Sequence, residues 1–188
     1  MTRNNEHIYK ANIVILGASG YTGAEAIRLL VNNDNYNITA LSADSNAGTS
    51  ISKIYPHLNG LDLPELKKIE DINFSKVDAV LSCLPHGKSQ KILSSLPKDI
   101  KICDLSADFR FDNINSYEKA YDKKHQAKDL QKEAVYGLTE INRDKIKNAR
   151  FIANPGCYPT SALLPILPLL NNNIIKYGNI IVDSKSGV

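Results

Sequence analysis

An apolar run that ends in regularly spaced glycines is the feature that most constrains how this chain can fold. The run covers residues 13–16 (IVIL), and residues 17–23 that follow it read GASGYTG. A short, continuous, β-branched run is typical of a strand buried on both faces of a parallel sheet. Apolar residues then recur at helical spacing from Tyr21 to Asn32, and residues 38–42 indicate a second strand. The order strand, glycine turn, helix, strand predicts an α/β fold.

The same alternation continues through most of the chain. Apolar runs predict strands over 77–83, 100–105 and 150–153, helices over 89–96 and 117–126, and an irregular stretch over 44–65. This pattern predicts a Rossmann-type, doubly wound parallel sheet over residues 10–155. Residues 156–188 predict the beginning of a second, α+β domain. There we expect an apolar helix over 160–170, bent or shortened by Pro165 and Pro168, and a strand over 180–185.

Composition excludes several classes of protein and partner. The 188 residues are 43% hydrophobic with a net charge of +3, and the lysines are scattered, so we expect no nucleic-acid partner. No apolar run approaches the ~20 residues that span a bilayer, so we expect no membrane partner. Residues 1–7 are polar and lack a signal-peptide core. Three cysteines without metal-like spacing predict free thiols, no bound metal and a cytoplasmic protein.

The glycine turn predicts a site for a dinucleotide. Gly17 allows a tight turn, Gly20 lets the backbone approach a pyrophosphate, and Gly23 permits close packing of helix on strand. The helix that follows offers free N–H groups and a positive dipole end to the phosphates. The other residues of the turn that we expect at the cofactor are Ser19, Tyr21 and Thr22. The alternative is a turn with a structural role only.

The end of the second strand indicates which dinucleotide is bound. An NAD-selective site places a carboxylate there to bind the ribose hydroxyls. Here the predicted strand ends at Ser42, and a hydroxyl tolerates a 2′-phosphate better than a carboxylate does, so the sequence favours NADP. No arginine stands nearby to hold the phosphate. Asp44 could still turn inward, which would favour NAD instead.

The three thiols differ in their surroundings. Cys83 and Cys103 end apolar strands, where cysteine behaves as a small hydrophobic residue. Cys157 follows Gly156 on a turn, and Pro159 suits the first turn of the helix that comes next. A helix N-terminus stabilises a thiolate, so this position predicts a nucleophile. A nicotinamide site combined with such a thiol favours reduction of an activated acyl group through a thioester.

Two further segments follow strand ends, where ligands bind in sheets of this type. Pro85 and His86 lie in LPHG and are expected to contact the cofactor or the substrate. Ser106 and Arg110 lie in DLSADFR and could hold a phosphate or a carboxylate, although Arg110 could instead form an ion pair with Asp108 or Asp112. The remaining histidines, which we interpret as surface residues, are His7, His57 and His125.

Five segments together resemble one known family. They are GASGYTG at 17–23, LPHG at 84–87, DLSADFR at 104–110, YGLTE at 136–140 and NPGCYPT at 154–160. The set resembles N-acetyl-gamma-glutamyl-phosphate reductase, the NADPH-dependent family of arginine biosynthesis. The resemblance implies that Cys157 forms the thioester, that the glycine turn holds NADP with the 42–48 loop near the ribose, and that LPHG and DLSADFR line the cleft. It places Asn154 at the substrate with Ser106 and Arg110.

Members of this family are longer than the present chain and are oligomeric. The sequence stops at SKSGV directly after an apolar run, so we expect an N-terminal part of a longer protein, with the acid–base histidine of the family beyond residue 188. Two alternatives remain open. One is a related reductase acting on an aminoadipyl or aspartyl phosphate, and the other is a dinucleotide-binding fragment without catalysis.

Overall fold

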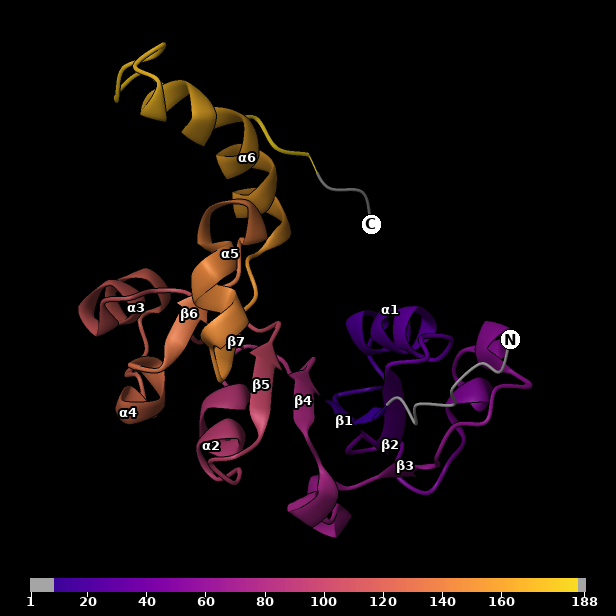
Figure 1. The fold of residues 1–188 in the computed structure, drawn as a ribbon. Coiled ribbons are helices and arrows are strands. Elements are labelled where there is room, and N and C mark those ends of the chain that lie inside the picture. The colour runs from indigo at the N-terminus through magenta and orange to yellow at the C-terminus, as the bar shows by residue number, and fades with distance from the viewer. Residues whose placement is uncertain (1–8, 186–188) are drawn as a thin grey trace, which may run out of the picture.

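A single parallel sheet of seven strands organises the chain (Figure 1). The computed structural model describes residues 9–185, so His7 and the last three residues lie outside the description. All six pairs of neighbouring strands are parallel, in the order β3-β2-β1-β4-β5-β7-β6. The strands are β1 (Ala11–Leu16), β2 (Tyr36–Ser42), β3 (Leu66–Lys67), β4 (Ala79–Ser82), β5 (Lys101–Asp104), β6 (Ala134–Tyr136) and β7 (Phe151–Ala153).

Helices connect these strands. They are α1 (Tyr21–Leu30), α2 (Ser89–Ser94), α3 (Ile114–Tyr121), α4 (Lys128–Gln131), α5 (Thr139–Asn148) and α6 (Cys157–Asn171). Most agree with the sequence prediction, but α3 lies three residues earlier than expected because Asn113 caps its N-terminus and Asp122 ends it in a left-handed conformation. The short elements β3, β6, α4 and α5 were not predicted. The stretch 44–65 is irregular, as expected, and it contains two 3₁₀ turns.

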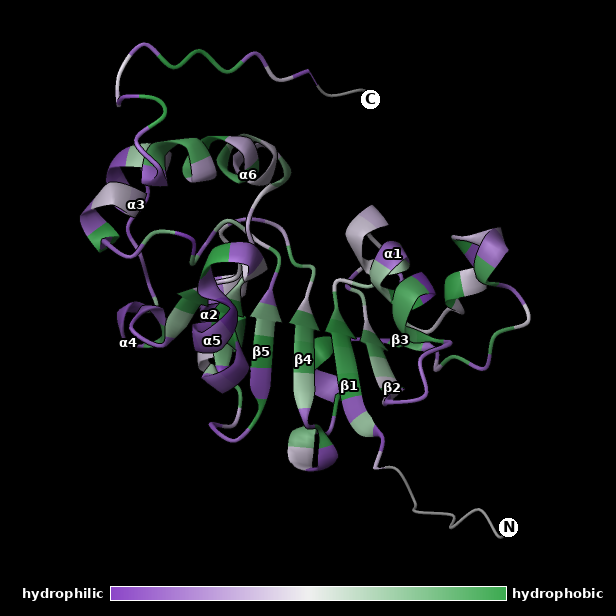
Figure 2. Cartoon of the chain, turned by 45° about the horizontal axis from the view of Figure 1, so that its top comes forward, coloured by the Kyte–Doolittle hydropathy of each residue, from purple (hydrophilic) through white to green (hydrophobic). Residues whose placement is uncertain are grey.

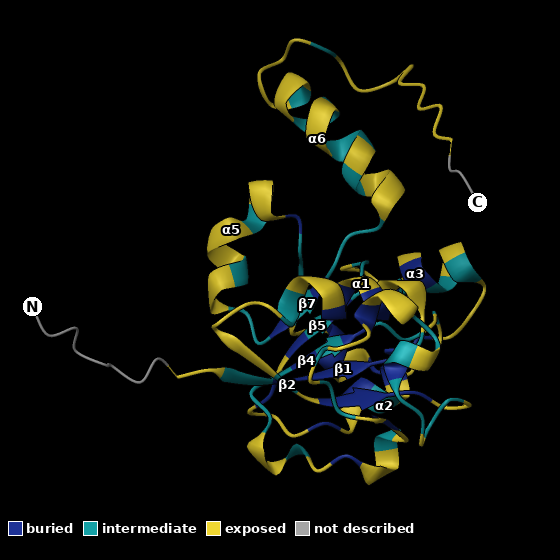
Figure 3. Cartoon of the chain, turned by 90° about the vertical axis from the view of Figure 1, so that its right-hand side faces the viewer, coloured by how far each residue is buried: buried dark blue, intermediate teal, exposed yellow. Residues whose placement is uncertain are grey.

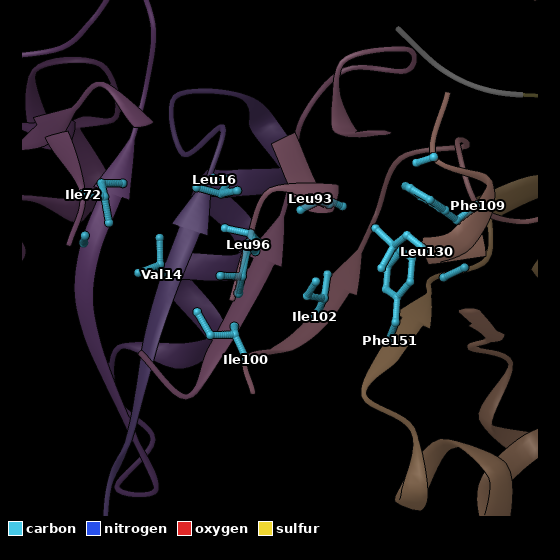
Figure 4. Packing of buried hydrophobic residues seen from close by; sticks show 14 residues of the cluster. Val14, Leu16, Ile72, Leu93, Leu96, Ile100, Ile102, Phe109, Leu130 and Phe151 are labelled. Atoms are coloured by element: carbon cyan, nitrogen blue, oxygen red, sulfur yellow. The ribbon is translucent and has the colours of Figure 1, made fainter. Parts of the chain in front are cut away.

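Both faces of the sheet are buried around β1, which is why this strand contains a continuous apolar run. Ile13 and Ile15 of β1 point to one face, where they meet Ala24 and Ile27 of α1. Val14 and Leu16 point to the opposite face, and Figure 4 shows the cluster there, with Leu93 of α2, Leu130 of α4 and Phe151 of β7. Helices on both faces of a parallel sheet confirm the doubly wound architecture.

The position of β1 determines where a ligand can bind. The chain moves outward from β1 through β2 to β3, and then returns to build β4, β5 and β7 on the other side of β1. In open sheets of this kind ligands bind beyond the carboxyl ends of the strands, where the order reverses. The segments that follow β1, β4, β5 and β7 all leave this same edge, and they contain the residues that the sequence marked as functional.

The last described part of the chain stands apart from the sheet. Helix α6 is apolar but has no buried residue, and it projects away from the sheet (Figures 2 and 3). It runs through Pro165 and Pro168 to Asn171, so of the two expected effects of these prolines, bending or shortening, shortening was wrong. The strand predicted over 180–185 was also wrong. A strand requires a hydrogen-bonded neighbour, but within the described part of the chain no strand pairs with this segment, and Ile181 is exposed.

Within residues 9–185, the structure contains no helix long and apolar enough to cross a membrane.

Candidate active site

The glycine turn after β1 is built around a backbone conformation that other residues avoid. Gly17 has φ +73°, and a Cβ at this position would lie 2.7 Å from the carbonyl oxygen of Cys83. Ser42, at the end of β2, stabilises the turn, since its hydroxyl accepts a hydrogen bond from the Gly17 amide at 3.0 Å. The Ser42 side chain, which we expected at the cofactor ribose, is 1% exposed. Its hydroxyl is therefore bound to the turn in this structure.

The other two glycines of the turn have different surroundings. A Cβ at Gly23 would lie 2.6 Å from the Cα of Ala18, so only glycine lets α1 pack this closely on the turn. A Cβ at Gly20 would have no atom nearer than the Gly17 carbonyl oxygen, at 3.6 Å. The protein itself therefore does not require glycine at position 20. The free space there is what a bound pyrophosphate needs in order to approach the backbone.

The remaining residues of the turn lie around the N-terminus of α1. Tyr21 is the first residue of the helix and is 85% exposed, and Thr22 is also exposed. The Ser19 carbonyl accepts a hydrogen bond from the Tyr55 hydroxyl at 3.0 Å, which ties the 51–58 segment to the turn. Asp44, the carboxylate that could favour NAD, is exposed beyond the end of β2.

The loop after β4 lies beside the glycine turn and is held by the segment after β5. The Gly87 amide donates to both carboxylate oxygens of Asp108 at 2.9 Å. Nδ1 of His86 lies 2.9 Å from the same carboxylate, and its ring packs on Tyr121 at 4.4 Å between centroids. Both ring nitrogens of His86 are shielded from solvent. Pro85 is exposed and forms the outer part of the loop.

A buried polar cluster lies beneath this loop. The Ser106 hydroxyl donates to Asp104 at 2.6 Å and lies 2.9 Å from the hydroxyl of Ser89. Asp104 is fully buried, which raises the pKa of its carboxyl group despite the hydrogen bond from Ser106. Ser106, which we expected at the substrate, is 6% exposed and belongs to this cluster. Sequence alone could not show which way its hydroxyl points.

Arg110 braces the turn that precedes the thiol. Its Nε donates to the Asn154 carbonyl and its Nη2 to the Leu105 carbonyl, both at 2.9 Å. It forms no ion pair with Asp108 or Asp112. Nη1 has no hydrogen-bond partner among residues 9–185. A Cβ added at Gly156 would lie only 2.7 Å from this nitrogen. One edge of the guanidinium is thus directed to the turn just before the thiol.

Cys157 is the first residue of α6 and is exposed. Gly156 caps this helix in an extended conformation, and its carbonyl accepts a hydrogen bond from the Thr160 amide at 3.0 Å. The other two thiols are unsuitable as nucleophiles. Burial raises the pKa of Cys83 to about 12 and that of Cys103 to about 11, so both remain protonated at neutral pH. Only Cys157 combines exposure with a helix N-terminus.

Hydrogen bonds and close packing connect all four strand ends in sequence. The glycine turn contacts the end of β4 at Cys83, and the loop after β4 is bonded to Asp108 after β5. The carbonyl of Asp104 in turn accepts the Asn154 amide at 2.8 Å, which joins β5 to the turn after β7. The structure therefore unites the predicted cofactor and nucleophile segments along one edge of the sheet.

A cleft of about 560 Å³ opens beside Arg110 along the edge strand β6. Its lining includes Tyr136, the first residue of the YGLTE motif, and also Asn142 and Lys145, which the sequence analysis did not single out. The Asn142 side chain donates to the Tyr136 carbonyl at 2.9 Å. These residues belong to β6 and α5, which are too short or too polar to stand out as periodic patterns.

His125 lies inside the protein, contrary to our interpretation of it as a surface residue. It is 3% exposed, with Nε2 3.1 Å from the Asp108 carbonyl and Nδ1 accepting from the Ala127 amide at 3.2 Å. Burial lowers its pKa below the usual value. His57 is exposed and packs against Tyr55.

Comparison with known protein families decides where this chain belongs. The sequence signature of the family described as semialdehyde dehydrogenase, NAD binding domain, matches residues 12–149. The chain belongs to this family. The matched residues begin in β1 and end after α5, so they contain the glycine turn, the loop after β4 and the segment after β5. The matched residues therefore form the NAD-binding domain of a semialdehyde dehydrogenase, and the prediction that the cofactor is a nicotinamide dinucleotide is confirmed.

Curated relatives extend the similarity to almost the whole chain. A protein named probable N-acetyl-gamma-glutamyl-phosphate reductase, chloroplastic, from Arabidopsis thaliana is 56% identical over 94% of this chain and 44% of its own length. An N-acetyl-gamma-glutamyl-phosphate reductase from Cereibacter sphaeroides is 51% identical over 94% of this chain and 52% of its own length. The resemblance predicted from five motifs is confirmed. The chain spans about half the length of these curated relatives.

Solved structures of semialdehyde dehydrogenases share the fold. Aspartate semialdehyde dehydrogenase II from Vibrio cholerae, complexed with ASA, gives a TM-score of 0.62 at 18% identity, over 86% of this chain and 47% of that one. Aspartate semialdehyde dehydrogenase from Candida albicans, with NADP, gives 0.57 at 18% identity, over 87% and 47% of the two chains. At this identity the comparison establishes the architecture and nothing finer.

Proposed function

We propose that this chain supplies the cofactor site and the nucleophile for NADPH-dependent reduction of N-acetyl-L-glutamyl 5-phosphate to the 5-semialdehyde, with release of phosphate. The observation that carries the proposal is Cys157, an exposed thiol at a helix N-terminus on the same edge of the sheet as the glycine turn. The names of the relatives support this substrate. In this proposal residues 10–155 form the NADP-binding domain and residues 156–188 begin the catalytic domain.

The residues present fit a dinucleotide phosphate. The space beside Gly20 that a Cβ would occupy is free, so a pyrophosphate can approach the backbone there, near the N–H groups at the start of α1. Ser19, Tyr21 and Thr22 would surround the phosphates, and Pro85 and His86 would lie toward the nicotinamide. Selection of NADP is supported by the end of β2, where Ser42 stands in place of a carboxylate.

Cys157 carries the covalent chemistry. Its thiolate attacks the acyl carbon, a C–S bond forms, and the C–O bond to phosphate breaks, so that the phosphate leaves with the electron pair. Arg110 has an edge without a partner beside Gly156, and with Asn154 it would hold the phosphate. Bound NADPH would supply the hydride that converts the thioester to an aldehyde, and Cys157 then returns to the thiolate.

Acylation of the thiol tests this proposal without requiring a full reaction cycle. The chain is mixed with N-acetyl-L-glutamyl 5-phosphate, and the peptide that contains Cys157 is analysed by mass spectrometry. We expect one N-acetylglutamyl group on Cys157 and one phosphate released per chain. Cys157→Ala should abolish both, whereas Cys103→Ala, which removes a half-buried thiol on β5, should leave both unchanged.

Parallel reactions separate the alternatives. Faster acylation by aspartyl phosphate or aminoadipyl phosphate would replace the assigned substrate. Absence of acylation by all three compounds, together with retained NADPH binding, would instead identify a dinucleotide-binding unit without catalysis. Fluorescence titrations with NADPH and NADH test the cofactor assignment, and tighter binding of NADH would overturn the choice of NADP.

A further inference from the structure

The carboxylate of Asp108 is the point where the loop after β4 is held, and the sequence analysis gave it no role in binding. Besides the Gly87 amide, it accepts hydrogen bonds from the hydroxyl of Ser89 at 2.6 Å and from the hydroxyl of Tyr117 at 3.1 Å. The Tyr117 hydroxyl also accepts a hydrogen bond from the Gln90 side chain at 2.8 Å. Groups from the loop, α2 and α3 thus converge on one fully buried side chain.

The electrostatics keep this carboxylate ionised. Burial opposes its ionisation, but hydrogen bonds from Ser89, Gly87 and Tyr117, together with the nearby His86, lower the pKa of Asp108 below its usual value. Tyr117 remains protonated, because burial and the charge of Asp108 raise its pKa to about 12. Each surrounding group therefore acts as a donor toward a charged acceptor, and such hydrogen bonds are stronger than neutral ones.

The loop needs this support because its own conformation is an unusual one. Gly87 has φ +81°, and the nearest atom to an added Cβ would be Nζ of Lys123, at 3.9 Å. Position 87 thus requires glycine for its backbone angle and not for lack of space. Within the loop, the Lys88 amide bonds to the Pro85 carbonyl at 3.1 Å. Asp108 supplies the long-range bond that directs the Gly87 amide and places the His86 ring.

We propose that Asp108 is a positioning residue for the nicotinamide half of the cofactor. It holds the 85–88 loop and His86 in one conformation before the cofactor binds. In doubly wound sheets the two halves of a dinucleotide lie on the two sides of the point where strand order reverses, and here β4 is on the side opposite β2. A loop that is already ordered loses less entropy on binding. This inference rests on the proposed function, because it assumes that the chain binds NADPH.

Asp108→Asn is the variant that tests the proposal. An asparagine keeps the size of the side chain and one accepting oxygen, but it removes the charge and one acceptor for the Gly87 amide. Asp78→Asn is the matched control, because Asp78 also accepts a backbone amide, that of Asn12 at 2.7 Å, but at the amino edge of the sheet. Two ligands are titrated: NADPH, and adenosine 2′,5′-bisphosphate, which lacks the nicotinamide half.

We expect Asp108→Asn to weaken NADPH binding about tenfold, equivalent to about 1.4 kcal/mol, and to leave adenosine 2′,5′-bisphosphate binding within twofold. Exchange of the Gly87 amide with solvent, followed by NMR, should accelerate in the same variant. The control should change none of these quantities. If Asp108→Asn does not fold, Tyr117→Phe, which removes one donor to the carboxylate, should still weaken NADPH selectively.

Equal weakening of both ligands would show a general structural role and overturn the proposal, as would unchanged NADPH binding. Failure of the proposed cofactor site gives a different result, because the unmodified chain would then bind neither NADPH nor adenosine 2′,5′-bisphosphate. Failure of the proposed acylation leaves both bindings intact and is detected in the separate thioester assay.

Discussion

Gly20→Ala and Gly23→Ala should affect different properties of the protein, although the two glycines lie three residues apart in one turn. The first should weaken NADPH binding, and the second should lower stability. At Gly23 the new methyl group would lie 2.6 Å from the Cα of Ala18 and 2.7 Å from the carbonyl oxygens of Ala18 and Gly17. All three atoms are backbone, so no side chain can rotate away. At Gly20 the nearest atom is 3.6 Å away, which is an ordinary contact, and the backbone angles of φ −83° and ψ 163° suit alanine.

The magnitudes follow from these distances. Carbon atoms prefer a separation of about 3.5–4.0 Å, so α1 must move roughly 1 Å from the turn to accept a methyl group at position 23. Overpacking costs about 1–3 kcal/mol, and with three backbone contacts we take the upper end. The higher helix propensity of alanine offsets about 1 kcal/mol of this loss at position 23. The free energy of unfolding should therefore fall by about 2 kcal/mol for Gly23→Ala and change by less than about 1 kcal/mol for Gly20→Ala.

Thermal denaturation and NADPH titration measure the two effects separately. For Gly23→Ala we expect Tm to fall by about 4–8 °C, at roughly 2–4 °C per kcal/mol for a chain of this size. For Gly20→Ala we expect unchanged denaturation but NADPH binding that is about tenfold weaker or worse, because the methyl group occupies the approach of the pyrophosphate. Unchanged NADPH affinity in Gly20→Ala would refute the assignment of this space to the cofactor. Equal loss of stability in both variants would refute the packing argument.

Three further predictions concern other parts of the site. Burial lowers the pKa of His125, so the folded state favours the neutral ring. The contribution of His125 to stability should be complete above the unfolded pKa of about 6.5 and should decline as the pH falls below that value. His125→Gln should reduce this decline, as measured by urea denaturation at about pH 7.5 and at about pH 5.5. Ser42→Ala leaves the Gly17 amide without its acceptor and should lower the free energy of unfolding by about 1–3 kcal/mol, while affinities for NADPH and NADH fall in parallel. Arg110→Lys cannot bond both backbone carbonyls, so acylation of Cys157 should slow at least tenfold, measured by phosphate release.

The first part of the fold was predictable from sequence because its signals are local. The run at 13–16 is buried on both faces, which its unbroken apolar character indicated, and Gly17 and Gly23 each have a separate steric reason within the same turn. The parallel sheet followed from the alternation of such runs with helical spacing. The position of Cys157 at a helix start was predictable, because a turn with glycine and proline precedes it.

Other features depend on contacts that no local pattern contains. Gly87 and Asp108 are 21 residues apart, and nothing in either segment shows that one binds the other. His125 was interpreted as a surface residue because its neighbours in sequence are polar, yet it packs against Phe109 with 5.4 Å between ring centroids. The segment 180–185 has the composition of a strand, but composition cannot provide the neighbouring strand that would pair with it.

The segment from Asp104 to Arg110 links the two chemical parts of the site. Asp108 holds the loop after β4, whereas Arg110 and the Asp104 carbonyl hold the turn before Cys157 through both backbone groups of Asn154. Hydride transfer requires the acyl carbon and the nicotinamide to be positioned relative to each other with a precision of less than about 1 Å, because small displacements slow the reaction strongly. If one seven-residue segment sets the position of both parts, a change within it affects their separation even when each part remains intact. The functional importance of DLSADFR is then its geometry as much as any direct contact with substrate.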